Sequence, residues 1–297
     1  NSVNRIGWGG ILADRFGISN PNQNMAMTIS TDGDNVYQTA EDVVPYFVSP
    51  WGVDRIDNID PTWSQPTARR QALYQLLNGP LGNPLERTYA TGFKRTVSNY
   101  EQVISALVPS ATTFDAIFGA DDTIDDYLTR QLKMVARIIA ARGTLGPRRQ
   151  VFMVSLGGFD LHDLLPDRHP GLLGNVAGAI KSFHDATVEL GVADQVTAFT
   201  ASDFGRTLSS NGDGSDHGWG SHHFVAGGAV KGRRFYGVAP AVAVNGPDDV
   251  GQGRLLPSTS VDQFGATLAT WFGVSDTDLP LVVPNIGNFS TRQLGFL

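Results

Sequence analysis

Val151-Phe-Met-Val-Ser-Leu156 is a short, continuous apolar run that ends at the pair Gly157-Gly158. Such a run is typical of a β-strand that is covered on both faces, as in a parallel sheet. Leu172–Leu190 follows with apolar residues at helical spacing, and Gln195–Thr200 is a second strand-like run. The order strand, helix, strand predicts a βαβ unit, and hence an α/β fold with a mainly parallel sheet flanked by helices.

The segments after this unit extend the predicted core. Phe224–Val230 and Phe235–Val238 are predicted to be strands, and Val261–Phe272 to be a closing helix. The stretch 204–221, rich in Gly, Ser and Asp, is interpreted as a polar loop.

The N-terminal half differs from this core in composition and in the spacing of its apolar residues. Residues 1–65 are rich in turn-forming residues. A helical block follows, in which apolar residues recur every three or four positions; its helices are Thr67–Asn78, Thr88–Leu107 and Asp122–Arg142. We therefore expect a loop-rich and helical segment at 1–149, as an insertion or cap, and an α/β core with a metal site at 150–297, within one structural domain.

Composition limits the possible functions. With 41% hydrophobic residues among 297, the chain can bury a large core, and its net charge of −7 gives no electrostatic footprint for nucleic acid. The absence of cysteine excludes disulfides, thiolate zinc sites and cysteine nucleophiles. No apolar run approaches the roughly 20 residues that span a bilayer. The first residue is Asn1, not Met, so we interpret the chain as a processed or truncated product.

The histidines cluster in the sequence. All six lie between residues 162 and 223: His162, His169, His184, His217, His222 and His223. Asp160 and His162 directly follow the first predicted strand, and in an extended chain side chains two residues apart point the same way. The carboxyl ends of strands are where open α/β sheets bind ligands. A carboxylate and an imidazole suit zinc or another divalent ion of the first transition row, so we predict metal ligands here.

The second predicted strand ends in the same manner. Asp203 follows it, and two neighbouring parallel strands lie about 5 Å apart, so this carboxylate is a further candidate ligand. Arg206 could hold an anionic substrate through paired hydrogen bonds, or form a salt bridge with a neighbouring aspartate.

Asp216-His217-Gly-Trp219-Gly-Ser-His222-His223 is the third candidate segment. Its glycines allow a tight fold around a centre, with His217 and His222 as ligands. Asp216 could orient His217, Trp219 could wall the pocket, and His223 should point away from His222. The alternative is a polar loop with incidental histidines.

These segments resemble a known bacterial family. Val154-Ser-Leu-Gly-Gly-Phe-Asp-Leu-His162, Asp203-Phe-Gly-Arg-Thr207, Asp216–Phe224 and the closing Leu294-Gly-Phe-Leu297 resemble the family called domain of unknown function 1501 (DUF1501). The match is weaker over 1–149, where Gly7–Asp14 resembles a segment that lies well inside the family's precursors. The resemblance implies a fold similar to the alkaline phosphatase and sulfatase superfamily and a twin-arginine export signal, and therefore a periplasmic or extracellular protein.

The resemblance also implies a ligand set. One metal of that superfamily takes an Asp and a nearby His after a strand and a later loop His, which Asp160, His162 and either His217 or His222 match in order. A second metal takes the Asp of an Asp-His pair; Asp203 matches the Asp, but Phe204 stands in place of the His. The superfamily's nucleophile comes from an early strand that nothing here matches, so another fragment of the precursor could supply it.

Two functions follow as hypotheses. The first is a metal-dependent hydrolase of small phosphate, sulfate or related esters, with one or two divalent ions, zinc foremost, and Arg206 on the anion. The second is an exported binding or structural protein that retains the metal loop without turnover. An esterase with Ser202 or Ser221 as nucleophile is disfavoured, because neither lies in a Gly-x-Ser-x-Gly motif.

Overall fold

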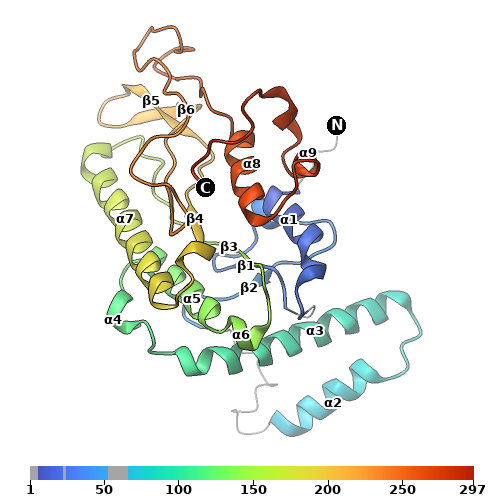
Figure 1. Cartoon of the computed structure of the whole chain (residues 1–297). Coiled ribbons are helices and arrows are strands. Elements are labelled where there is room, and N and C mark those ends of the chain that lie inside the picture. Colours follow the sequence, from blue (N-terminus) through green and yellow to red (C-terminus); the bar gives the residue numbers. More distant parts are fainter. Residues whose placement is uncertain (1–5, 23–24, 53–65) are drawn as a thin grey trace.

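The computed structural model describes residues 6–22, 25–52 and 66–297 (Figure 1). Asn1 and parts of the loop-rich region predicted at 1–65 lie outside these ranges. A small parallel sheet forms the centre, with β1 (Thr28–Ser30) between β2 (Tyr46–Phe47) and β3 (Val151–Met153). Ile29 lies opposite Phe152 in the register. The sheet therefore joins strands from both sides of residue 150.

Helices surround this sheet. Those of the N-terminal half are α1 (Trp8–Phe16), α2 (Pro66–Asn78), α3 (Pro84–Leu107), α4 (Asp115–Phe118), α5 (Tyr127–Ala140) and α6 (Arg142–Leu145). Those of the C-terminal half are α7 (Leu165–Glu189), α8 (Val261–Phe272) and α9 (Leu279–Val282). Short 3-10 turns lie at Gly17–Ser19, Val36–Gln38, Val108–Ser110, Ala193–Gln195 and Pro284–Asn288. Within the described residues, no helix combines the length and the apolar character that a membrane span needs.

Two further strand pairs follow α7. β4 (Thr197–Phe199) pairs antiparallel with β7 (Val225–Gly227), and β5 (Gly205–Ser210) forms a hairpin with β6 (Ser215–Gly218). Figure 1 shows α5 and α7 on one side of the central strands and α1 and α8 on the other. The chain is thus a mixed α/β protein in which helices cover both faces of the strands.

The alternation of side chains along β3 explains these layers. Phe152 packs against the apolar cluster of α3 and α5, together with Ile29 of β1. Val151 points to the opposite face and packs with Ala13 of α1 and Phe272 of α8. Because successive strand residues face opposite sides, a continuous apolar run is what a sheet between two helical layers requires.

The structure departs from the sequence-based expectations at several elements. The predicted parallel pairing of the 151–156 and 195–200 strands is wrong: β3 pairs with β1, and β4 pairs with β7. Residues 235–238 form no strand. The predicted polar loop at 204–221 contains the β5–β6 hairpin, and α7 begins at Leu165, seven residues earlier than expected. Pro170 is the sixth residue of α7, and its missing N–H removes one backbone hydrogen bond of the helix.

Candidate metal centre

The loop after β3 positions the first two candidate ligands. Leu161 is 1% exposed and anchors the loop, whereas Asp160 and His162 on either side of it are about half exposed. The Leu161 carbonyl also accepts a hydrogen bond of 3.3 Å from the Ser215 N–H in β6. Asp160 lies in a turn, where the Leu161 N–H donates to the Phe159 carbonyl at 2.9 Å, and Asp160 Oδ1 and His162 Nε2 lie 3.0 Å apart.

The β5–β6 hairpin supplies the third ligand. Arg206 and His217 are direct partners in its register, so their side chains lie on the same face of the hairpin. The turn packs closely on the loop after β3: a Cβ atom added to Gly214 would lie 2.2 Å from the His162 backbone carbon. Only glycine permits this approach, which brings the hairpin against the Asp160 loop.

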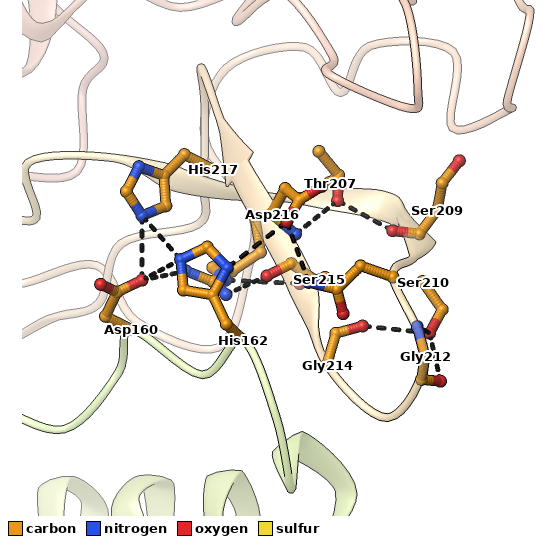
Figure 2. A network of polar contacts seen from close by, with 12 residues as sticks. Asp160, His162, Thr207, Ser209, Ser210, Gly212, Gly214, Ser215, Asp216 and His217 are labelled. Carbon is orange, nitrogen blue, oxygen red and sulfur yellow. Dashed lines mark hydrogen bonds and ion pairs between the residues drawn. The ribbon is translucent and has the colours of Figure 1, made fainter.

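Three ligand atoms converge where these two segments meet (Figure 2). His217 Nε2 lies 2.9 Å from Asp160 Oδ1, and the Nε2 atoms of His162 and His217 lie 3.2 Å apart. Among the described residues, Asp160, His162 and His217 are the group whose ligand atoms could share a metal ion, all within 4.8 Å of one another. Of the two loop histidines proposed from the sequence, the structure brings His217 to the other two ligands.

The donor set fits a first-row divalent cation. Ligands at the usual zinc distance of about 2.0–2.1 Å occupy tetrahedral corners about 3.3 Å apart, and the observed separations approach that value. Two Nε2 atoms that face each other cannot both carry a proton between them, so lone pairs are concentrated at this point. Two imidazoles and one carboxylate leave a fourth tetrahedral position open, as in catalytic rather than purely structural zinc sites.

Arg206 dominates the electrostatics of Asp160. Its Nη1 lies 2.6 Å from Asp160 Oδ1, while Nε and Nη2 contact Ser215. The hydrogen bond from Arg206, followed by that from His217, holds the pKa of the Asp160 carboxyl below its usual value. The carboxylate is therefore ionised over the range in which proteins bind metal. Arg206 thus forms the salt bridge that the sequence left as the alternative to anion binding.

Asp216 lies behind His162. Its Oδ1 is 3.4 Å from His162 Nδ1, and it accepts a 2.9 Å hydrogen bond from Asn211, which lowers the pKa of the Asp216 carboxyl. The predicted orienting role toward His217 is therefore corrected, since Asp216 faces His162 instead. A carboxylate on the far nitrogen of a ligating histidine fixes the tautomer and the orientation of the ring.

Phe204 supports the other imidazole. Its ring stacks on that of His217 with centroids 4.0 Å apart and planes at 21°, and the Arg206 guanidinium lies 5.8 Å from the Phe204 centroid. Where the resemblance implies a second histidine ligand, this chain thus has an aromatic ring that packs against a candidate ligand.

The remaining candidates lie outside the three-ligand group. Asp203 is exposed, His222 makes an edge contact with Phe235, and Trp219 is 67% exposed. His223 lies 3.4 Å from the Thr200 hydroxyl and against Phe264, away from the contact of His222, in agreement with the predicted opposite directions. Burial, with a smaller effect from His222, lowers the pKa of His223.

Sequence inspection missed Asn211 and Ser215, which hold Asp216 and Arg206. The signal was present in Asn211-Gly-Asp-Gly214, because Asn-Gly and Asp-Gly pairs are typical of tight hairpin turns. A hairpin centred there pairs Ser210 with Ser215 and would place Arg206 opposite Trp219; the register shift between Arg206 and Ser210 brings His217 to that position instead.

Comparison with protein families supports the resemblance. Curated protein sequences and solved structures give no match. The family model described as "Protein of unknown function (DUF1501)" matches residues 23–281, which include both strands of the hairpin, the Asp160 loop and most of the fold. The chain belongs to the DUF1501 family.

Proposed function

We propose that Asp160, His162 and His217 bind one divalent metal ion, with zinc the first candidate, and that the chain carries the metal site of a hydrolase of small phosphate, sulfate or related esters. The supporting observation is the convergence of three ligand atoms within 4.8 Å on two segments distant in sequence. Their exposure leaves room for a small ester to approach the site.

The surrounding residues suit an anionic ester. A zinc ion, when bound, polarises an ester oxygen and lowers the pKa of a bound water. Arg206 lies within 2.6 Å of the Asp160 carboxylate, so an anion bound beside that ligand would be within reach of the guanidinium. The planar guanidinium can donate two parallel hydrogen bonds to phosphate or sulfate oxygens.

The proposal also includes membership of a wider superfamily and an origin in a longer precursor. The order of the ligands, with Asp and His after one strand and a later loop His, supports membership of the alkaline phosphatase and sulfatase superfamily. On this proposal the chain is part of a longer, exported bacterial precursor, whose N-terminal fragment is a partner and the source of the missing nucleophile.

A specific observation supports a second candidate, an exported binding or structural protein that holds a metal without turnover. Asp203 lies outside the ligand group, so a second ion would lack the carboxylate expected from the sequence. Arg206 is already engaged by Asp160 and Ser215. These contacts favour a stable metal-bound surface loop.

Metal analysis tests the common element of both candidates. We expect close to one equivalent of metal in undialysed protein and strong loss of zinc affinity in Asp160→Ala and His217→Ala. His184→Gln, on α7, is the matched control and should bind zinc as the unaltered chain does. Less than about a tenth of an equivalent in the unaltered protein, with no zinc uptake in calorimetry, would contradict the metal site.

An ester panel then separates the candidates. The zinc-loaded chain and its full precursor are assayed on p-nitrophenyl phosphate and p-nitrophenyl sulfate. Turnover that Asp160→Ala abolishes supports the hydrolase. Stoichiometric zinc without turnover of either ester, in either form of the protein, rejects the hydrolase and leaves the binding protein.

A further inference from the structure

The outer edge of β3 carries unused backbone groups. The Val151 N–H donates to Met27, and the Met153 carbonyl accepts from Thr31, so the odd-numbered residues face β1. In a parallel ladder the intervening residues direct their N–H and C=O groups to the other side. Within the described residues, the backbone groups of Phe152 and Val154 have no hydrogen-bond partner on that side.

The outer edge of β4 is open in the same way. Thr200 N–H donates to Phe224, so Thr200 and Ala198 share the hydrogen-bonded positions with β7. The backbone groups of Thr197 and Phe199 therefore point away from β7, and the described part of the chain offers them no partner. The Thr197 hydroxyl is also buried without a hydrogen bond.

These two edges belong to one layer. Phe152 of β3 and Ala198 of β4 both pack on the apolar cluster of α5 and α7. The chain runs from β3 through α7 to β4, the crossover that connects parallel strands, and such strands need not be neighbours. The segment after β4 reaches the segment after β3 through the Arg206–Asp160 ion pair, so the carboxyl ends of both strands point to the same side.

The side chains that line the interval between the two strands are apolar on both faces. Val154 and Val196 lie on the side of α5 and α7. On the opposite side, the Phe199 ring contacts Trp8 at 5.7 Å and Phe264 at 5.7 Å. Apart from the buried Val151, the residues of β3 and β4 are nonetheless only half-buried, which is unusual for continuous apolar strands between two helical layers.

We propose that the interval between β3 and β4 is a slot for one further β-strand, supplied by another polypeptide segment. Its chemistry is set by the surroundings: an extended, uncharged run of about five apolar residues, with no proline, that hydrogen-bonds on both edges. A strand parallel to β3 would run toward the end of the sheet from which the Asp160 loop leaves β3. The proposal rests on the backbone pairing and stands independently of the proposed function.

The test uses a synthetic peptide, acetyl-Thr-Val-Ile-Val-Leu-Ser-amide, and residue-resolved amide hydrogen exchange of the whole chain. Without the peptide, the Phe152, Val154, Thr197 and Phe199 amides should exchange at least about 100-fold faster than Met153 and Ala198. Saturating peptide should slow exchange at β3 and β4 together. Two versions, N-methylated at odd or at even positions, should each lose binding, because each removes the donors to one edge.

Variants of one residue complete the test. Val154→Pro removes the N–H that only an added strand would use, so it should abolish peptide binding while the chain stays folded. Val154→Ala truncates the side chain but keeps the N–H, and should retain binding. The slot is refuted if the four amides are protected without peptide, if millimolar peptide protects neither strand, or if only one N-methyl series matters, as at a simple sheet edge.

Discussion

One carboxylate oxygen organises the candidate centre at the scale of single residues. Asp160 Oδ1 is shared by Arg206, His162 and His217, with atom pairs between 2.6 and 3.0 Å. A cation that binds here replaces the protons of the imidazoles and competes with the guanidinium. Metal affinity should therefore depend on every residue that fixes the two rings, beyond the three ligands themselves.

Asp216→Asn tests this dependence at His162. The variant keeps the size of the side chain but removes the charge that faces Nδ1, so the preferred tautomer of the ring is lost. We expect zinc affinity to fall by about 10- to 100-fold, as for other carboxylates behind ligating histidines. Isothermal titration measures the change, with Asp213→Asn in the same turn as control. Equal affinities for the two variants would contradict the role of Asp216.

His223 should make the fold sensitive to mild acid. Its pKa in the folded chain lies below the ordinary value of 6.5, so the unfolded chain takes up the proton first as pH falls. Stability is then complete above about pH 6.5 and declines below it. We expect His223→Gln to flatten this decline in urea unfolding at pH 7.5 and 5.5, while His184→Gln leaves it unchanged. Parallel declines in the two variants would refute the assignment.

At the scale of elements, the hairpin turn sets the position of His162. Gly214→Ala would force a Cβ against the His162 backbone, and neither segment can yield without moving a ligand. We expect at least a tenfold loss of zinc affinity by titration. Gly157→Ala is the control, because an added Cβ there meets no atom within 4 Å. An unchanged affinity in Gly214→Ala would show that the turn does not position the ligand.

Helix α8 tests the local rules of capping. The Ser260 hydroxyl accepts from the Asp262 N–H at 3.0 Å, and the Gln263 side chain accepts from the Ser260 N–H at 3.0 Å. Ser260→Ala should lower the free energy of unfolding by about 1 kcal/mol in denaturant titration. The exposed Ser290→Ala is the control. A loss no greater than that of the control would mean that the cap contributes little.

Helices α8 and α1 show which helices can be predicted from the periodicity of the sequence and which cannot. The bounds predicted for α8 are confirmed at both ends, because a capping serine and a left-handed Gly273 flank a helical apolar stripe. Helix α1 lies in the region predicted to be loop-rich, and it contains Gly9 and Gly10, which have low helical propensity. They are needed there for close approach to Tyr37 and Thr39. Contacts distant in sequence thus override local propensity.

The candidate site likewise has one part that could be predicted from local sequence and another that depends on contacts distant in sequence. The proximity of Asp160 and His162 is expected from their spacing of two residues, although the structure places them in a loop with a turn at Asp160 and not in an extended strand. The choice between His217 and His222 depends on the register of a hairpin, and the pairing of β4 with β7 depends on partners far along the chain. Such long-range choices leave no periodic signal in either segment.

For the molecule as a whole, metal binding should be coupled to folding. The ligands come from segments 55 or more residues apart, so the unfolded chain holds no preformed site. At free zinc about 100-fold above Kd, we expect about 2.7 kcal/mol of added stability, reversed by EDTA. Thermal unfolding with and without zinc measures this. Asp160→Ala is the control, and an equal shift in that variant would point to binding elsewhere.

The register of the hairpin also determines which side chains reach Asp160. Arg206 and His217 reach Asp160 together because they are cross-strand partners, although the register shifts further along, before Ser210 pairs with Ser215. In a β-ladder, a slip of one residue turns every side chain to the other face. A single deletion between Arg206 and Ser210 would therefore turn the guanidinium to the face opposite His217, away from Asp160, so the length of this segment matters to the site as much as the three candidate ligands do.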